Sequence, residues 1–208
     1  MSCFLRSLAG LLCCLLVVAC GGDPASDADF EAEVQAYIQK FPHQETYRYA
    51  MQLTGGDASK FNAWSSSETP ALIKAGDDTI VRTNNDTYYK MAFVQLDAGP
   101  VVVTSAVPAE DRFVSFQLMD DRNANYRNVI HPYGAYTHYT GTKPAEIQGE
   151  AIEVPSALSV VLVRVEVKDG TDEADVAAAK AIFHGITIQG PTLDEAPHVD
   201  LLTGFSQE

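Results

Sequence analysis

The fold is decided by the stretch TYYKMAFVQL at residues 87–96, which is followed by DAGP at 97–100 and by VVVT at 101–104. Aromatic and β-branched residues are enriched in strands because they pack well on a pleated, half-buried surface. The four residues between the two runs contain aspartate, glycine and proline, which are typical of turns. This segment therefore predicts two strands joined by a turn.

The strand pattern continues downstream, at intervals of about a dozen residues, with candidates at 112–119, 126–130, 135–140, 151–154 and 158–168. Helical periodicity flanks this region. It predicts a helix over 30–41 that Pro42 ends, a second over 45–53 that ends at Thr54-Gly55-Gly56, and a third over 171–184 capped by Thr171 or Asp172. We expect a mainly β fold, an antiparallel β-sandwich or barrel-like domain with short N-terminal helices and a C-terminal helix.

The amino terminus carries Val17-Val18-Ala19-Cys20 after an apolar stretch at 8–19. That stretch is shorter than the roughly 20 residues that span a bilayer, and its length is typical of a signal-peptide core. Small residues before a cysteine resemble a bacterial lipobox. The resemblance implies removal of residues 1–19 and lipidation of Cys20. We expect a flexible tether at 20–28, a β domain at 29–190 and a polar tail at 191–208.

The sorting signal and the charge both bear on location. Gly21 follows the cysteine where aspartate would mark inner-membrane retention, so we expect a lipid-anchored envelope protein, on the periplasmic face of the outer membrane if the source bacterium has two membranes. The chain has 28 acidic and 14 basic residues and a net charge of −14. This charge repels nucleic acid and anionic headgroups, so attachment to the membrane must come from the lipid. We expect no cofactor.

A family resemblance is carried by RTNNDTYY at 82–89 followed by LDAGPVVV at 96–103. These residues resemble the domain of unknown function family 1254, which is marked by an Arg-x-Asn-x-Asp-Thr-x-Tyr segment before a Gly-Pro-Val-Val strand. The resemblance implies a β-sandwich-like domain of unresolved biochemistry. Larger relatives continue into a second β-rich domain, numbered 1214, whereas only forty residues follow Lys168 here. We therefore expect a separately encoded 1214-type protein as a partner.

The densest polar cluster contains Arg82, Asn84, Asp86, Thr87 and Tyr89. In a functional interpretation, Asp86 accepts a proton or binds a hydroxyl while Arg82 holds an anionic group. In a structural interpretation, Asn84 and Asp86 form Asx turns and Arg82 pairs with Asp86. We favour the structural interpretation, because the asparagines at 84 and 85 lie where turn chemistry needs them.

An aromatic segment spans 131–139, where Tyr136 and His138 would share one face of a strand. Such side chains suit a ligand or a protein interface, and they equally suit a sheet edge covered by its own tyrosines. His131 and His138 have no third ligand in view, so we expect no metal. Our expected ligand-binding residues are Arg82, Asn84, Asp86, Tyr89, Asn125, Tyr136 and His138.

Two hypotheses for the function remain. The motifs of serine hydrolases, zinc proteases, P-loop proteins and dinucleotide-binding proteins are all absent from the sequence. The first hypothesis is a non-catalytic module that binds a small ligand or a protein. The second is a hydrolase or lyase acting on a small envelope metabolite, with Asp86, Asp120 and His131 as acid–base candidates. An apolar cleft floored by tyrosines would favour the first, and convergence of Asp86, Asp120 and a histidine within hydrogen-bond reach would favour the second.

Overall fold

The computed structural model describes residues 27–66, 71–72, 84–109 and 111–197. Cys20, the expected signal peptide, the tether as far as residue 26, and Arg82 lie outside the described residues. The chain divides into two compact units, one of residues 1–39 with 204–208 and the other of residues 40–203. Both sheets belong to the second unit. None of the helices in the described ranges is both long enough and apolar enough to cross a bilayer.

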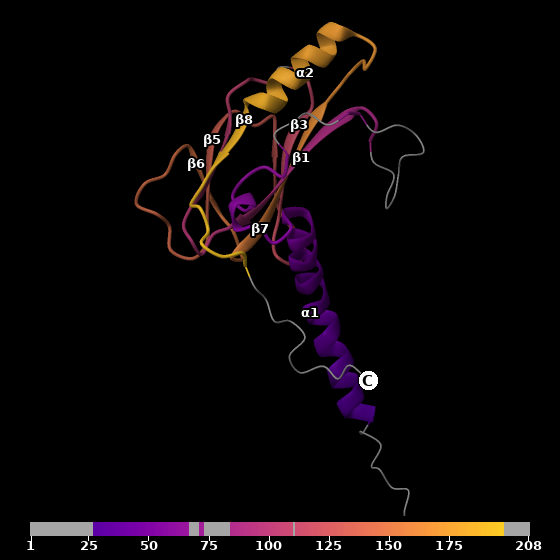
Figure 1. Ribbon diagram of the computed structural model, residues 1–208, viewed down its shortest axis with the longest axis vertical. Helices are drawn as coiled ribbons and strands as arrows, with labels where there is room; N and C mark the ends of the chain where they lie inside the picture. Colours follow the sequence, from indigo (N-terminus) through magenta and orange to yellow (C-terminus); the bar gives the residue numbers. More distant parts are fainter. Residues whose placement is uncertain (1–26, 67–70, 73–83, 110, 198–208) are drawn as a thin grey trace, which may run out of the picture. The chain divides into compact units, whose positions relative to one another are not determined.

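The second unit is built on two four-stranded sheets (Figure 1). Sheet A has the order β1-β7-β3-β4, and sheet B has the order β6-β5-β2-β8. The strands are β1 (Thr87–Gln95), β2 (Val101–Ser105), β3 (Val114–Met119), β4 (Asn125–Ile130), β5 (Gly134–Tyr139), β6 (Glu150–Glu153), β7 (Leu158–Glu166) and β8 (Ile186–Gln189). The turn at 97–100 carries the chain from sheet A to sheet B. The mainly β sandwich is confirmed, and the two sheets do not close into a barrel.

The core lies between the inner faces of the two sheets. Ala92 and Val94 of β1 and Val103 of β2 are fully buried in it. Phe116 of β3 meets Tyr136 of β5 edge to face, with ring centroids 5.6 Å apart, so an aromatic pair joins the sheets. This apolar interior supplies most of the burial that holds the sandwich together.

Helix α2 (Glu173–Gly185) packs against strands of both sheets. It begins as expected, because the Asp172 carboxylate accepts a hydrogen bond from the Ala174 N–H at 2.9 Å. Its buried residues include Ala179 and Phe183, which belong to the same core as the strands. Strand β8 follows at once and pairs with β2. The sequence pattern does not predict this short strand.

The N-terminal helices are a correction to the expected fold. One helix, α1 (Asp27–Thr54), runs through Pro42, where the sequence predicted a break. Proline at 42 lacks the N–H that would donate to the Ile38 carbonyl, so the helix continues with one backbone bond fewer. The Pro42 carbonyl itself is bonded, because the Thr46 hydroxyl donates to it at 3.0 Å. The helix ends where predicted, and the Gly56 N–H donates to the Met51 carbonyl at 3.2 Å. A single turn of 3-10 helix, η1 (Ala58–Lys60), follows.

A second correction concerns β6, which pairs with β5 in parallel within an otherwise antiparallel pair of sheets. After β5 the chain returns to the start of that strand before β6 begins. The Thr137 hydroxyl holds the returning chain by donating to the Gln148 carbonyl at 2.8 Å and accepting from its N–H at 2.9 Å. Gly149 has φ +67°, and a Cβ there would lie 1.9 Å from the Ala135 carbonyl oxygen. The parallel pairing thus depends on glycine at 149.

The free edge of β1 is covered by residues that follow α1. The Asn62 N–H donates to the Phe93 carbonyl at 2.9 Å, and the Ser65 N–H donates to the Met91 carbonyl at 2.8 Å. The Asn62 side-chain oxygen accepts from the Gln95 N–H at 2.8 Å. These bonds satisfy backbone groups that an edge strand otherwise exposes.

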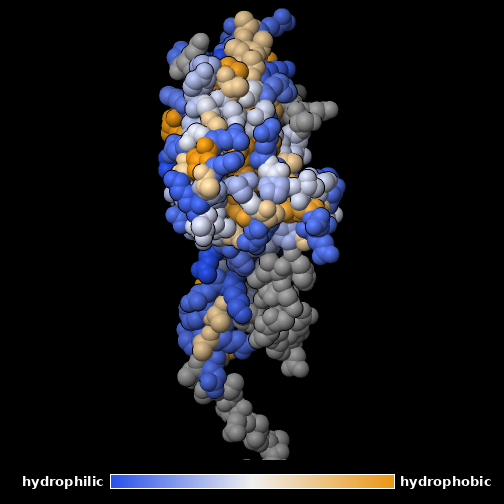
Figure 2. All heavy atoms as spheres, turned by 90° about the vertical axis from the view of Figure 1, so that its left-hand side faces the viewer, coloured by the Kyte–Doolittle hydropathy of each residue, from blue (hydrophilic) through white to orange (hydrophobic). Residues whose placement is uncertain are grey.

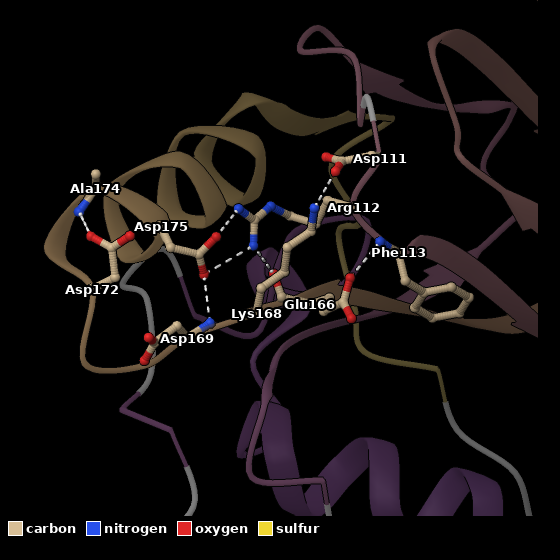
Figure 3. Close-up of polar contacts among 9 residues, drawn as sticks. All are labelled: Asp111, Arg112, Phe113, Glu166, Lys168, Asp169, Asp172, Ala174 and Asp175. Carbon is tan, nitrogen blue, oxygen red and sulfur yellow. Dashed lines mark hydrogen bonds and ion pairs between the residues drawn. The ribbon is translucent and has the colours of Figure 1, made fainter.

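A polar network fastens α2 to the ends of the central strands (Figure 3). The buried Arg112 guanidinium donates to the Glu166 carbonyl at 2.7 Å and to the Asp175 carboxylate at 2.5 Å. Asp175 also accepts from the Asp169 N–H at 3.0 Å. These bonds, with that of Arg112 first among them, lower the pKa of Asp175 to about 2.

Candidate ligand-binding cleft

A recess of about 410 Å³ lies between α1 and the outer face of sheet A. Its floor is a row across three neighbouring strands, since Phe93 of β1 pairs with Val160 of β7, which pairs with Met119 of β3. Met91, two residues from Phe93, extends the floor along β1. Alternation places these four apolar side chains on the face opposite the inter-sheet core. The floor is therefore continuous and offers a ligand no charge.

The helical wall comes from the last turns of α1. Phe41, Pro42, Thr46 and Tyr49 line the cleft, and Glu45 and Arg48 also border it. The Arg48 guanidinium donates to both carboxylate oxygens of Glu45, with the shortest distance 2.7 Å. This hydrogen bond lowers the pKa of Glu45 and raises that of Arg48. The two charges on the helix thus offset each other.

The turn between β3 and β4 also lines the cleft, to which it contributes Arg122 and Asn123. The Asp120 carboxylate accepts from the N–H groups of Arg122 at 2.9 Å and Ala124 at 2.8 Å. Asn123 has φ +60°, a left-handed conformation that asparagine tolerates. The turn therefore presents Arg122 on a fixed backbone.

Helix α1 is tied to this turn by His43, whose Nδ1 lies 2.9 Å from an Asp121 carboxylate oxygen. The ring of His43 also meets that of Tyr47 edge to face at 4.9 Å. Burial first, then the charges of Asp121 and Asp97, raises the pKa of Tyr47 to about 12. The helical wall and the turn between β3 and β4 are thus joined by a polar contact between residues that do not line the cleft.

The acid–base candidates are not brought together. Asp86 precedes β1 and Asp120 follows β3, and these two points lie at opposite ends of β7, because Thr87 pairs with Glu166 and Met119 pairs with Val160. Six residues of strand separate the ends, which corresponds to about 20 Å. His131 follows β4, and its N–H donates to the Val114 carbonyl at the start of β3. The arrangement gives no shared proton-transfer site among Asp86, Asp120 and His131.

Of the polar cluster before β1, the structure describes Asn84, Asp86, Thr87 and Tyr89. Asn84 and Asp86 are exposed, and Asp86 accepts a hydrogen bond from the Thr87 hydroxyl at 2.9 Å. Tyr89 lies on the outer face of sheet A, where the Arg164 guanidinium lies 5.8 Å from its ring centroid. None of the four lines the cleft.

The remaining expected ligand residues lie on β4 and β5. Asn125 is exposed at the start of β4. Tyr136 is buried against Phe116, and its hydroxyl accepts from the Tyr133 N–H at 3.1 Å. His138 is fully buried, and neither ring nitrogen has a hydrogen-bond partner. Tyr136 and His138 do share one face, as predicted, but it is the core face.

Two of the ionisable side chains in the described residues, His138 of β5 and Lys90 of β1, are buried inside the sandwich. Burial first, then the charge of Arg127, lowers the pKa of His138 to about 4. Burial lowers the pKa of Lys90 to about 8. The Lys90 ammonium donates to the carbonyls of Phe183 at 2.8 Å and Ile186 at 3.1 Å, at the end of α2. Lys90 therefore joins β1 to the helix, a role that suits a cation near a helix C-terminus.

Sequence reasoning missed the cleft, although β1 carried a signal for it. Tyr88, Ala92 and Val94 face the inter-sheet core, and Met91 and Phe93 alternate with them on the other face. A strand apolar on both faces is covered on both. Arg122 has no such signal, because its place in the lining depends on where the turn meets α1. In the described part of the chain, no three His, Cys, Asp or Glu side chains are grouped as metal ligands.

Comparison with family models gives a match to the family described as "Protein of unknown function (DUF1254)" over residues 65–190. The chain belongs to the DUF1254 family. The match covers all eight strands and α2 of the DUF1254 domain, whereas α1 precedes it. A search of curated proteins found no match.

Two solved structures are similar to this DUF1254 protein. The VPA0106 protein from Vibrio parahaemolyticus matches with a TM-score of 0.59 and 17% identity, over 79% of this chain and 41% of that one. An uncharacterised protein from Burkholderia cenocepacia matches with a TM-score of 0.42 and 14% identity, over 88% of this chain and 48% of that one. The chain spans less than half the length of each. The first of these likenesses supports the fold.

Proposed function

We propose that this DUF1254 protein is a non-catalytic binding module that holds a small, largely apolar molecule in the cleft between α1 and sheet A. The observation that carries the proposal is the cleft of about 410 Å³ over the floor of Met91, Phe93, Met119 and Val160. Ligand sites in proteins are typically mostly apolar recesses of about 300–1,000 Å³ with a few polar groups that orient the ligand. The cleft has that size and composition.

Figure 2 views the molecule from the side of sheet B, and its hydrophobic residues form small areas separated by hydrophilic ones. The aromatic segment at 131–139 is also a poor docking surface, because Tyr136 is buried. A separately encoded 1214-type partner stays a proposal, and of the tyrosines in that segment Tyr133 is 64% exposed and Tyr139 is half-buried.

We also propose that the module is held at the envelope by lipid on Cys20, on the periplasmic face of the outer membrane. The support is the sequence Val17-Val18-Ala19-Cys20 with Gly21 after it. A Cys20→Ser variant should lose metabolic labelling with radioactive palmitate and leave the outer-membrane fraction. Unchanged labelling and fractionation would contradict lipid anchoring without touching the proposal for the cleft.

The cleft is tested with N-phenyl-1-naphthylamine, a neutral apolar probe that fluoresces when it leaves water. The purified protein should bind it at a single saturable site. Met91→Trp, which fills the floor, should weaken binding at least tenfold. Ile130→Trp is the matched control, because Ile130 is 52% exposed on the outer face of sheet A and does not line the cleft.

Circular dichroism establishes that both variants keep the fold. Equal probe binding by Met91→Trp and Ile130→Trp, or no saturable binding by the unaltered protein, would contradict the proposed function.

A further inference from the structure

We propose that the ligand of the cleft is a single-chain amphiphile with an anionic carboxylate head, and that Arg122 recognises the head. This inference rests on the proposed function and adds the chemical class of the ligand. The apolar floor accommodates a hydrocarbon chain. The choice between an acidic, neutral and basic head is made by the charges that border the cleft.

Three charged side chains line the cleft, namely Glu45, Arg48 and Arg122. Glu45 and Arg48 form an ion pair, so neither is free to select a ligand charge. Arg122 forms no ion pair with any residue in the described ranges of the chain. The cleft therefore carries a net positive charge within a protein whose total charge is −14. That local reversal of sign favours an anion.

The carboxylates nearest to Arg122 in sequence are engaged elsewhere. Asp120 accepts two backbone N–H groups of its own turn. Asp121 lies 2.9 Å from His43 Nδ1. These contacts hold the carboxylate of Asp120 within the turn and that of Asp121 beside α1. The charged side chain that the turn contributes to the lining of the cleft is therefore Arg122.

The lining thus combines a cation with an apolar floor. A guanidinium matches a carboxylate because it can donate two parallel hydrogen bonds to it. A fatty acid of medium length has the required combination of a flexible apolar chain and one terminal carboxylate. An alcohol of equal length has the same chain without the charge, and a quaternary ammonium has the opposite charge.

The experiment compares decanoate, decanol and decyltrimethylammonium as competitors for bound N-phenyl-1-naphthylamine, at pH 7.5 and low salt. Decanoate should displace the probe at a concentration about two- to fivefold lower than decanol, the range expected for one exposed ion pair. Decyltrimethylammonium should be the weakest competitor. The preference for decanoate should fall with added salt, because exposed charges are screened.

Arg122→Gln should abolish the preference for decanoate while leaving displacement by decanol within twofold of the unaltered protein. Arg164→Gln is the control, because it removes the same charge from the outer face of sheet A at a residue outside the cleft. Equal potency of the three competitors, or a preference that survives Arg122→Gln, would overturn this inference and leave the proposed function standing. Failure of the probe itself to bind would instead contradict the proposed function.

Discussion

His138 offers a sharp test of the sandwich core, because it is a fully buried imidazole with no hydrogen-bond partner on either nitrogen. We predict that His138→Leu removes a specific part of the protein's sensitivity to acid. Leucine fills a similar volume and carries no polar atom. An unsatisfied buried polar group costs about 1–3 kcal/mol, and imperfect packing of a new core side chain costs about as much. The variant should therefore be close to the unaltered protein in stability at pH 7.

The pH dependence is where the two proteins should differ. The pKa of His138 is about 4 in the folded protein, against an ordinary value of 6.5. The unfolded chain therefore takes up the proton first as the pH falls, and folding stability is lost between pH 6.5 and pH 4. Linkage between these two pKa values gives a loss of about 2 kcal/mol between pH 7 and pH 5 from this one residue.

The assay is urea denaturation at pH 7 and pH 5, followed by circular dichroism. The loss of unfolding free energy on acidification should be about 2 kcal/mol smaller in His138→Leu than in the unaltered protein. His131→Asn is the control, since His131 is exposed and asparagine tolerates its φ of +50°. Equal losses in His138→Leu and the unaltered protein would refute the argument that this imidazole is buried in its neutral form.

Three further predictions concern the packing of the sandwich. Gly149→Ala should lower the unfolding free energy by at least about 2 kcal/mol, since its Cβ would clash with backbone; Gly141→Ala, at nearly the same φ but in open space, should cost about 1 kcal/mol in the same urea titration. Lys90→Met should lower the unfolding free energy by about 1–3 kcal/mol, because two carbonyls at the end of α2 lose their donor. The melting temperature should fall accordingly, and an unchanged melting temperature would contradict that role. The hydrogen bond from Arg112 lowers the pKa of Asp175 to about 2. The pair therefore stabilises the fold at neutral pH and loses that effect as the pH falls from 4 toward 2. Arg112→Met should flatten this part of the acid denaturation curve, and a curve of unchanged shape would argue against a stabilising role of the pair.

The sequence predicted the strands better than the helices, for a physical reason. Alternation and turn residues are local, and they located β1 to β7 within a few residues. Pro42 is also a local signal, but its cost was outweighed where residues such as Ala50, fully buried, pack on sheet A. The direction of β6 depended on Gly149 passing close to β5, a contact that no local pattern encodes.

The site was harder to predict because it is assembled from segments far apart in the chain. Its floor needs the register that aligns Phe93, Val160 and Met119, and its rim needs the turn at Arg122 to meet α1. The sequence predicted polar site residues such as Asp86 because they cluster locally. Alternation correctly put Tyr136 and His138 on one face, but which face was buried depended on the partner sheet.

The covering of β1 by Asn62 and Ser65 has a consequence for how this protein behaves at high concentration. β1 is nine residues long and mostly buried on both faces, and with a bare edge it would offer its backbone groups to a strand of a neighbouring molecule. The backbone acceptors at Met91 and Phe93 are already occupied from within the chain, so that edge cannot template growth of a shared sheet. Asn62 and Ser65 thus protect this edge against aggregation. Molecules in which these residues detach from β1 should self-associate more readily.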